Sequence, residues 1–451
     1  MKVSGVNSSN NISMARHRVI LPPSKAEIFY SEHKAITYSS AVLAAGLGVI
    51  YVSKGRPISK LAKSIAGSMS KLSESQVNPS RLSCIMSGEE LLKMLPRLKK
   101  ASYEATADNM KKGVYRADLH SHSNYSDGAG LVKNLLDDAT DYADSLYART
   151  KNKFIYALTD HDTVNGLKEA INIIAGNPAR YKSLDFVPAI EVSFAHSAPK
   201  SDNECEISKL LVYGINPYSP KINEFLNKIS QKRADMLNNF INDAKNLNLL
   251  AKFSIEEFSK YYEYEKYGNM MNLHWKAYHY LQTKHAVTQY ARKINQNPET
   301  LYSQIMEDSK GASVEILRAK RKLPINIGES DDFQVIFEKY APHFENGKLV
   351  ASGENTFEEV IEAFKDEKGV FMAFSQPAYL SEKVENPAET LKYFVENSKG
   401  LIKASESYHQ AYDSRISPDI IESLQKQTEQ LGLLNLGGQD NHKGKLFEVI
   451  T

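Results

Sequence analysis

The sequence predicts an α/β fold, because it combines short apolar runs that are typical of buried strands with a long stretch of helical periodicity. Residues 154–159, residues 184–190 and a run that begins at Leu434 have the first pattern. Residues 221–249 carry apolar side chains at three- and four-residue steps, as one face of a helix requires. Each apolar run leads into acidic or histidine side chains. Such groups at the carboxyl ends of strands are typical of active sites in α/β sheets and barrels.

Two alternating histidines form the first of these polar clusters. His120 and His122 follow a short run that we interpret as a strand, and Asp127 comes shortly after them. Side chains at i and i+2 of a strand point the same way, so the two imidazoles can hold one metal ion. The turn Ser126-Asp-Gly128 can bring the carboxylate back toward them. Because His-x-His pairs are also common on surfaces, the prediction depends on the clusters downstream.

Three further clusters offer the same types of ligand. They are Asp160-His161-Asp162, Glu191, and Asp440 with His442. Taken alone, His161 is more typical of a hydrogen-bonded loop histidine, and Glu191 of an ordinary strand-end carboxylate. Four clusters at strand ends favour a metal or catalytic site. Packing or surface roles are the simpler interpretation for the other histidines, although His196 lies near Glu191. These histidines are His17, His33, His196, His274, His279, His285, His343 and His409.

The four clusters resemble the motifs of the polymerase and histidinol phosphatase (PHP) family of metal-dependent phosphoesterases. The matching elements are Asp118-Leu-His-Ser-His-Ser with Ser126-Asp-Gly128, Thr159-Asp-His-Asp-Thr163, Pro188-Ala-Ile-Glu-Val-Ser193 and Gly437-Gly-Gln-Asp-Asn-His442. Their order and spacing look most like the branch of nucleoside 3′,5′-bisphosphate phosphatases and 5′-to-3′ exonucleases of short RNA. The resemblance covers residues 113–451 and implies a distorted (β/α)7 barrel with metal ions at its carboxyl-end mouth.

The resemblance also implies how the chain is divided. Residues 113–215 and 365–451 would form the two parts of the barrel, and residues 216–364 an inserted helical subdomain. Residues 222–233 are similar to the first helix of the insertion in that branch. Eight aromatic residues lie close together in the insertion beside lysines and arginines. They could stack unpaired bases, although helical packing explains the same pattern. They are Tyr261, Tyr262, Tyr264, Tyr267, Trp275, Tyr278, Tyr280 and Tyr290.

The resemblance implies two metal sites built from seven side chains. One site would use His120, His122, Glu191 and Asp440, and the other Asp127, His161 and His442. A third ion in the family usually takes two more histidines, but this sequence has Lys209 and Gln376 at those places. Lysine must lose its proton before it can bind a metal, and an amide oxygen is a weaker ligand than imidazole.

Two interpretations of these replacements stay open. In the first, two ions suffice and Lys209 supplies a fixed positive charge near a phosphate. In the second, the chain is a catalytically weakened PHP module that binds a phosphorylated ligand or a partner. Histidine and carboxylate ligands without thiolates suit Mn²⁺, Zn²⁺ or Fe²⁺, and the sequence does not choose among these ions.

The reaction expected from the resemblance is hydrolysis of a phosphate ester by a metal-activated hydroxide. The substrate would be a small phosphorylated metabolite, a nucleotide or the end of a short oligonucleotide. We expect Asp160 and Asp162 to orient His161 by hydrogen bonds, as metal-bound imidazoles usually require. Lys209 and Arg233 are candidates for phosphate binding, although Arg233 could equally be a solvated cation on a helix.

Composition narrows the remaining possibilities. The chain has 451 residues, of which 42% are hydrophobic, and this is ample for a packed core. Its net charge of only +2 argues against stable binding of duplex nucleic acid. Two distant cysteines, Cys84 and Cys205, favour a reducing compartment without disulfides. The oligomeric state is not predicted.

Residues 1–112 are expected to lie outside the barrel. Residues 1–34 are polar and are predicted to be disordered. Residues 35–53 are apolar and uncharged over most of their length, with lysines and an arginine beside them. This segment could anchor the chain to a membrane, with a cytoplasmic catalytic domain, or form a small apolar helix. Residues 54–112 are predicted to be a helical linker.

Overall fold

The computed structural model describes part of the chain. These residues are 82–197, 205–246, 257–258, 273–309, 331–350, 353–380, 384, 386–409, 416–442 and 444. The chain divides into two units, residues 1–76 and 77–451, and the description below concerns the second. The predicted disorder of residues 1–34 and the possible anchor at 35–53 lie outside the described residues. Among the described residues, no helix is long and apolar enough to cross a membrane.

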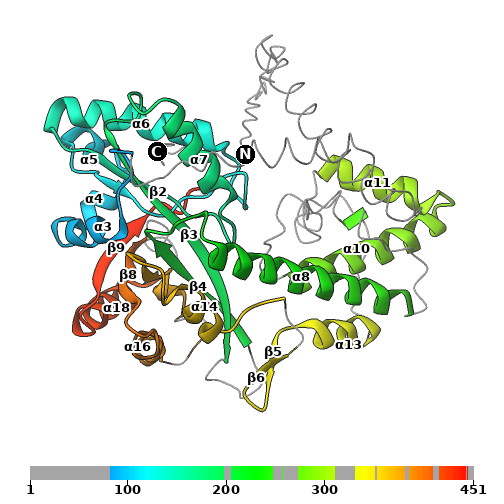
Figure 1. Cartoon of the computed structure of the whole chain (residues 1–451). Helices are drawn as coiled ribbons and strands as arrows, with labels where there is room; N and C mark the ends of the chain where they lie inside the picture. The colour runs from blue at the N-terminus through cyan, green and yellow to red at the C-terminus, as the bar shows by residue number, and fades with distance from the viewer. Residues whose placement is uncertain are drawn as a thin grey trace, which may run out of the picture. The chain divides into compact units, whose positions relative to one another are not determined.

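The predicted α/β fold is confirmed, because seven strands form one barrel-like sheet that helices cover (Figure 1). In sheet order the strands are β1 (Ala117–Asp118), β2 (Phe154–Leu158), β3 (Leu184–Ser197), β4 (Cys205–Tyr213), β7 (Phe371–Phe374), β8 (Ile402–His409) and β9 (Leu434–Gly438). The first three strands run parallel to one another, and so do the last three. Strand β4 is antiparallel to both of its neighbours, which makes the barrel distorted.

The barrel closes where its first and last strands meet. The Leu119 amide donates to the Gly437 carbonyl oxygen at 3.4 Å, and the Asp440 amide donates to the His120 carbonyl oxygen at 2.9 Å. An isolated parallel bridge between Ser121 and Asn441 continues this contact. The segment after β1, which carries His120 and His122, therefore lies beside the segment after β9, which carries Asp440 and His442.

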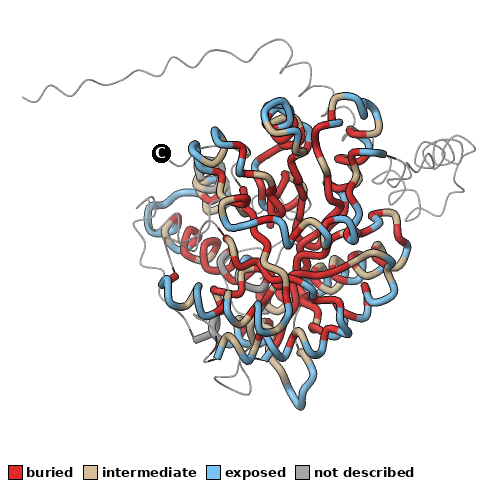
Figure 2. The backbone as a smooth tube through the Cα atoms, turned by 90° about the vertical axis from the view of Figure 1, so that its left-hand side faces the viewer, coloured by how far each residue is buried: buried red, intermediate tan, exposed pale blue. Residues whose placement is uncertain are grey.

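Successive side chains of a strand point to opposite faces of the sheet, and this alternation divides the core into an outer and an inner layer. On β2, Phe154, Tyr156 and Leu158 pack outward against helices, whereas Ile155 and Ala157 belong to the inner layer. The helices around the sheet are α6 (Val132–Thr150), α7 (Asn165–Gly176), α14 (Phe357–Phe364), α16 (Pro387–Asn397) and α18 (Pro418–Gln430), with a 3-10 turn η3 (Pro377–Tyr379). Buried residues therefore concentrate along the strands and on the inner faces of these helices (Figure 2).

The segment before β1 closes one end of the barrel. It contains α3 (Gly88–Met94), η2 (Leu95–Arg97), α4 (Lys100–Tyr103) and α5 (Ala107–Lys112). Ser87 caps α3 with a capping box that includes Glu90. Leu91, Leu95 and Tyr103 pack against inward-facing strand residues in the inner layer. This end of the barrel is consequently filled with apolar side chains.

The inserted segment contains the helices α8 (Pro220–Asn246), α10 (Leu273–Lys293), α11 (Pro298–Ser309) and α13 (Asp331–Tyr340). Ile222, Leu226 and Ile229 of α8 pack into the main core. Further along the same helix, Leu237 and Phe240 pack into a separate core with residues of α10 and α13. Helix α8 thus belongs to both the barrel and the insertion (Figure 1).

Two features of the insertion bear on the sequence predictions. Tyr278 and Tyr280 are buried in its core, as the packing interpretation expects. The insertion, which we expect to be a helical subdomain, also contains the strands β5 (His343–Glu345) and β6 (Lys348–Val350), which pair as a hairpin. Asn346 and Gly347 at its turn have φ values of 50° and 72°. An Asn-Gly pair is the usual turn for a two-residue hairpin, so the sequence carries a local signal for this one.

Replacing Gly88 by alanine should lower the free energy of unfolding by about 1–3 kcal/mol. A Cβ at this position would lie 2.2 Å from the Gly369 carbonyl oxygen, and backbone atoms cannot move aside cheaply. Urea unfolding measures the difference. Gly176→Ala is the matched control, because no atom lies within 4 Å of a Cβ added there. A Gly88→Ala variant as stable as the control contradicts the proposed packing.

Candidate metal centre

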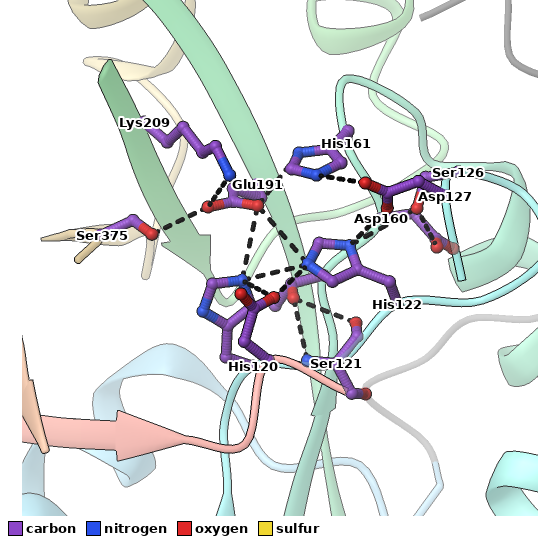
Figure 3. Close-up of polar contacts among 12 residues, drawn as sticks. His120, Ser121, His122, Ser126, Asp127, Asp160, His161, Glu191, Lys209 and Ser375 are labelled. Atoms are coloured by element: carbon purple, nitrogen blue, oxygen red, sulfur yellow. Dashed lines mark hydrogen bonds and ion pairs between the residues drawn. The ribbon is translucent and has the colours of Figure 1, made fainter. Parts of the chain in front are cut away.

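The polar clusters meet at the end of the barrel opposite α3. His120 and His122 follow β1, His161 follows β2, Glu191 lies on β3, and Asp440 and His442 follow β9. Figure 3 shows several of these side chains pointing toward one another. Strand β3 does not end at residue 190 as the sequence suggested, but continues to Ser197 with Glu191 inside it. A long β4 pairs with this extension, which explains why the strand runs on.

The first group of ligand atoms contains nitrogens of two histidines and oxygens of two carboxylates. The Nε2 atoms of His120 and His122 are 3.1 Å apart. The Asp440 Oδ1 atom lies 3.3 Å from the first and 3.0 Å from the second. Glu191 Oε2 lies 3.4 Å and 3.5 Å from the same two nitrogens. Four ligand atoms at these separations could surround one cation.

The second group lies around Asp127. Its Oδ2 atom is 3.3 Å from His161 Nε2, and its Oδ1 atom is 3.2 Å from His442 Nε2. His122 lies between the groups, with its Nδ1 atom 3.7 Å from Asp127 Oδ1. Asp127, His161 and His442 therefore come together with His122 as a second set that could hold an ion.

The chemistry of these atoms fits metal ions better than hydrogen bonding within the protein. His161 Nδ1, Glu191 Oε2 and Asp440 Oδ1 are buried without a hydrogen-bond partner among the described residues. The first two atoms are only 3.0 Å apart but do not have the geometry of a hydrogen bond. Buried polar atoms without partners are costly, whereas cations bound at these two groups would provide such partners.

Electrostatics keep the carboxylates charged. Burial opposes ionisation of Asp127, but bonds from His161 and His442 hold the pKa of its carboxyl well below the usual range. Burial likewise opposes ionisation of Glu191, and the Lys209 ammonium and His120 lower its pKa nonetheless. Burial, together with the neighbouring His161, lowers the pKa of His122 to about 4, so its ring is a neutral ligand at pH 7.

Two residues that the sequence analysis missed support the first group. Glu406 is buried on β8, and its Oε1 atom lies 2.8 Å from His120 Nδ1. A carboxylate at this position fixes the ring and directs Nε2 toward the ion site. His409, which we interpreted as a packing histidine, is buried near Asp440, with 3.4 Å between Nε2 and Oδ2. The signal for this strand is weak, because the exposed Lys403 interrupts its buried residues before Glu406 and His409.

The carboxylates of Asp160 and Asp162 bind segments on either side of the loop that carries His161, and their orientation of the His161 ring by hydrogen bonds remains a prediction. The Asp160 carboxylate accepts hydrogen bonds from the Ser123 amide at 2.7 Å and the Ser126 hydroxyl at 2.8 Å. The Asp162 carboxylate accepts from the Ser193 amide and hydroxyl, at 3.0 Å and 2.5 Å. Adjacent side chains on a loop point in different directions, and here both carboxylates fasten the loop to neighbouring segments.

Lys209 and Gln376 both place donors beside candidate ligands. Lys209 on β4 pairs with Ser193 of β3, and its Nζ atom lies 3.8 Å from Glu191 Oε1. Gln376 follows β7 with φ 48°, and its Nε2 atom donates to Asp440 Oδ2 at 2.7 Å. Burial opposes the charge on Lys209, but Glu191 raises the pKa of its ammonium group. Lys209 therefore remains a cation next to Glu191.

Arg233 and His196 lie apart from the ligand groups. Arg233 on α8 is fully buried, and its guanidinium is paired with Asp162 and Glu354. Its expected contact with a phosphate remains a prediction, and the structure shows it bound to two carboxylates instead. The Nε2 atom of His196 is 2.9 Å from the Ser208 hydroxyl oxygen, and His196 belongs to neither ligand group.

The chain is similar to known proteins at low sequence identity. No family model matches the chain, and no curated protein does. Two of the solved structures that are similar to the chain are a protein described as a metal-dependent phosphoesterase from Bifidobacterium adolescentis and an amidohydrolase from Chromobacterium violaceum with bound sulfate and no metal. The identities are 15% and 17% and the TM-scores 0.41 and 0.40, each over 73% of this chain and 88% of the other. Neither likeness decides what this chain does.

Binding of a divalent metal should release protons at neutral pH. Burial lowers the pKa of His161, but Glu191 outweighs burial and raises it to about 9 in the metal-free protein. A metal needs the neutral ring, so affinity for Mn²⁺ should rise about tenfold per pH unit for each proton displaced, from about pH 6.5 to about pH 8.5. Calorimetry in two buffers of different ionisation enthalpy measures the protons released. Affinity that does not change over this range contradicts the prediction.

Proposed function

We propose that the chain is a divalent-metal-dependent phosphoesterase of the PHP type. Its substrate would be a small phosphorylated metabolite, a nucleotide or the end of a short oligonucleotide. The observation that carries the proposal is the meeting of seven histidine and carboxylate side chains at one end of the barrel, with three buried ligand atoms that lack a hydrogen-bond partner among the described residues. Such a set is typical of metal centres in hydrolases.

Two ions would be held by the two groups. The first would take His120, His122, Glu191 and Asp440, and the second Asp127, His161 and His442. Glu191 Oε2 is near nitrogens of both groups, at 3.4 Å from His120 Nε2 and 3.0 Å from His161 Nδ1. This carboxylate is therefore placed to serve both ions. Imidazole and carboxylate ligands suit Mn²⁺, Zn²⁺ or Fe²⁺.

The bound ions would supply Lewis-acid charge that activates water and polarises the phosphate ester. The two ligand groups differ in solvent exposure, and a substrate would reach the more exposed group first. His120, His122 and Glu191 are fully buried, whereas the side chains of Asp127 and His442 are 52% and 36% exposed. A phosphate would accordingly approach from the side of Asp127 and His442.

Lys209 would take over part of the role of a third ion. Its ammonium group lies beside Glu191 and is held as a cation by the surrounding carboxylates. A fixed cation of this kind can bind a non-bridging phosphate oxygen and stabilise the charge that develops there. The Gln376 amide, which holds Asp440 in place, cannot supply that charge.

Elemental analysis together with hydrolysis assays tests the proposal. We expect two ions per chain, and manganese-dependent hydrolysis of an aryl phosphate and of a nucleoside 3′,5′-bisphosphate. Asp440→Asn should lose metal from the first group while the fold remains. His343→Ala is a control histidine outside both groups, and its metal content should equal that of the wild type. Tight metal binding without hydrolysis of either compound contradicts the enzyme and favours the binding module.

Lys209→Met should lower kcat by about 10–100-fold while both ions stay bound, because the charge is removed without removing a ligand. Lys168→Met is the matched control, since that lysine on α7 binds Asn223 instead. The double variant Lys209→His with Gln376→His should bind a third ion. A sharp rise in its activity above the wild type would show that the natural chain is a weakened module.

A further inference from the structure

Arg233 is a buried cation that joins helix α8 to two other parts of the chain. It lies on α8, the first helix of the insertion, and none of its side chain is exposed. One guanidinium nitrogen, Nη2, donates to Asp162 Oδ2 at 3.0 Å and to Glu354 Oε2 at 2.6 Å. Because a buried charge requires partners, the positions of these three residues depend on one another.

Asp162 links Arg233 to the second ligand group. It directly follows His161, and its backbone has φ 47°, a left-handed conformation that is uncommon for aspartate. Its amide donates to the Glu191 carbonyl oxygen at 2.8 Å, and its carboxylate is fixed to Ser193. The loop that carries His161 is thus held in a strained form by contacts that include Arg233.

Glu354 links Arg233 to the chain that returns from the insertion. The next residue, Asn355, accepts a hydrogen bond through its carbonyl oxygen from the Ala195 amide of β3 at 2.6 Å. Gly353 lies so close to α8 that an added Cβ would be 2.5 Å from Arg233 Cγ. The beginning and the end of the insertion therefore meet at Arg233, against the strand that carries Glu191.

We propose that Arg233 is a positioning residue that couples the seating of the helical insertion on the barrel to the second metal group, through Asp162. The inference rests on the proposed function for the identity of the ligands. Direct phosphate binding suits Arg233 less well, because two carboxylates already neutralise its charge in a buried place. Coupling of this kind is reciprocal. Metal binding at His161 therefore stabilises the seating of α8, and loosening of α8 weakens metal binding.

Metal affinity and hydrogen exchange test the coupling without any activity assay. Arg233→Met should weaken Mn²⁺ binding at one of the two sites by about tenfold or more, as is usual when a group behind a metal ligand is lost. Mn²⁺ should slow amide exchange in residues 220–235 of the wild type but not of this variant. In turnover, kcat should fall with little change in KM.

Three further variants keep the test decisive. Glu354→Gln retains the hydrogen-bonding shape and should fold even if Arg233→Met does not; it should weaken one Mn²⁺ site about threefold or more. Arg233→Lys keeps one charged nitrogen and should restore part of the affinity. Lys228→Met is the matched control, because Lys228 lies on the same helix, is 68% exposed and pairs within that helix, with Glu224. Its Mn²⁺ affinities should stay within about twofold of the wild type.

The outcomes separate this inference from the proposed function. Wild-type protein that holds two ions, with folded Arg233→Met or Glu354→Gln variants that bind both as tightly, overturns the coupling and leaves the proposed metal centre standing. Wild-type protein that holds no ion overturns both. Wild-type protein that binds metal but hydrolyses nothing, with the variants weakened as expected, supports the coupling while the phosphoesterase proposal fails.

Discussion

Closure of the barrel between β1 and β9 is the constraint on which the candidate site depends. The hydrogen bond from the Asp440 amide to the His120 carbonyl oxygen brings the first and last clusters of the sequence into contact. Without that junction the Nε2 atoms of His120 and His122 would face no carboxylate from the C-terminal strand. The apolar inner layer, filled by α3 and its neighbours, supports the closure from the other end. The candidate ligand side chains thus lie on or after strands whose lower parts are packed in an apolar core.

The second constraint is electrostatic. Several carboxylates and histidines share a buried space. In the metal-free protein, histidines such as His161 take up protons and so balance the charge of the carboxylates, as the raised pKa of His161 indicates. Buried like charges are tolerable only with counter-charges nearby. Lys209 supplies one such charge at a fixed place, whereas cations from solution would supply the rest. A metal ion bound here would therefore compete with protons for the histidine nitrogens.

Much of the site could be predicted from the sequence because its signals are local. The alternation of His120 and His122, and the position of His161 after an apolar run, follow directly from strand geometry. Glu406 and His409 were missed because their strand is amphipathic rather than uniformly apolar, and Lys403 interrupts it. The directions of Asp160 and Asp162 could not be read from sequence, since a loop side chain points wherever tertiary contacts fix it. The burial of Arg233 depends on Gly353 and Glu354, which are remote in sequence.

The measurement that tests the central claim most directly is an electron paramagnetic resonance spectrum of the protein loaded with two equivalents of Mn²⁺. Because Glu191 Oε2 faces ligands of both groups, the two ions should share a carboxylate and be magnetically coupled. We expect the broadened, many-lined spectrum of an exchange-coupled pair, and its loss in Glu191→Gln. A simple six-line spectrum of independent ions, unchanged in that variant, would contradict it.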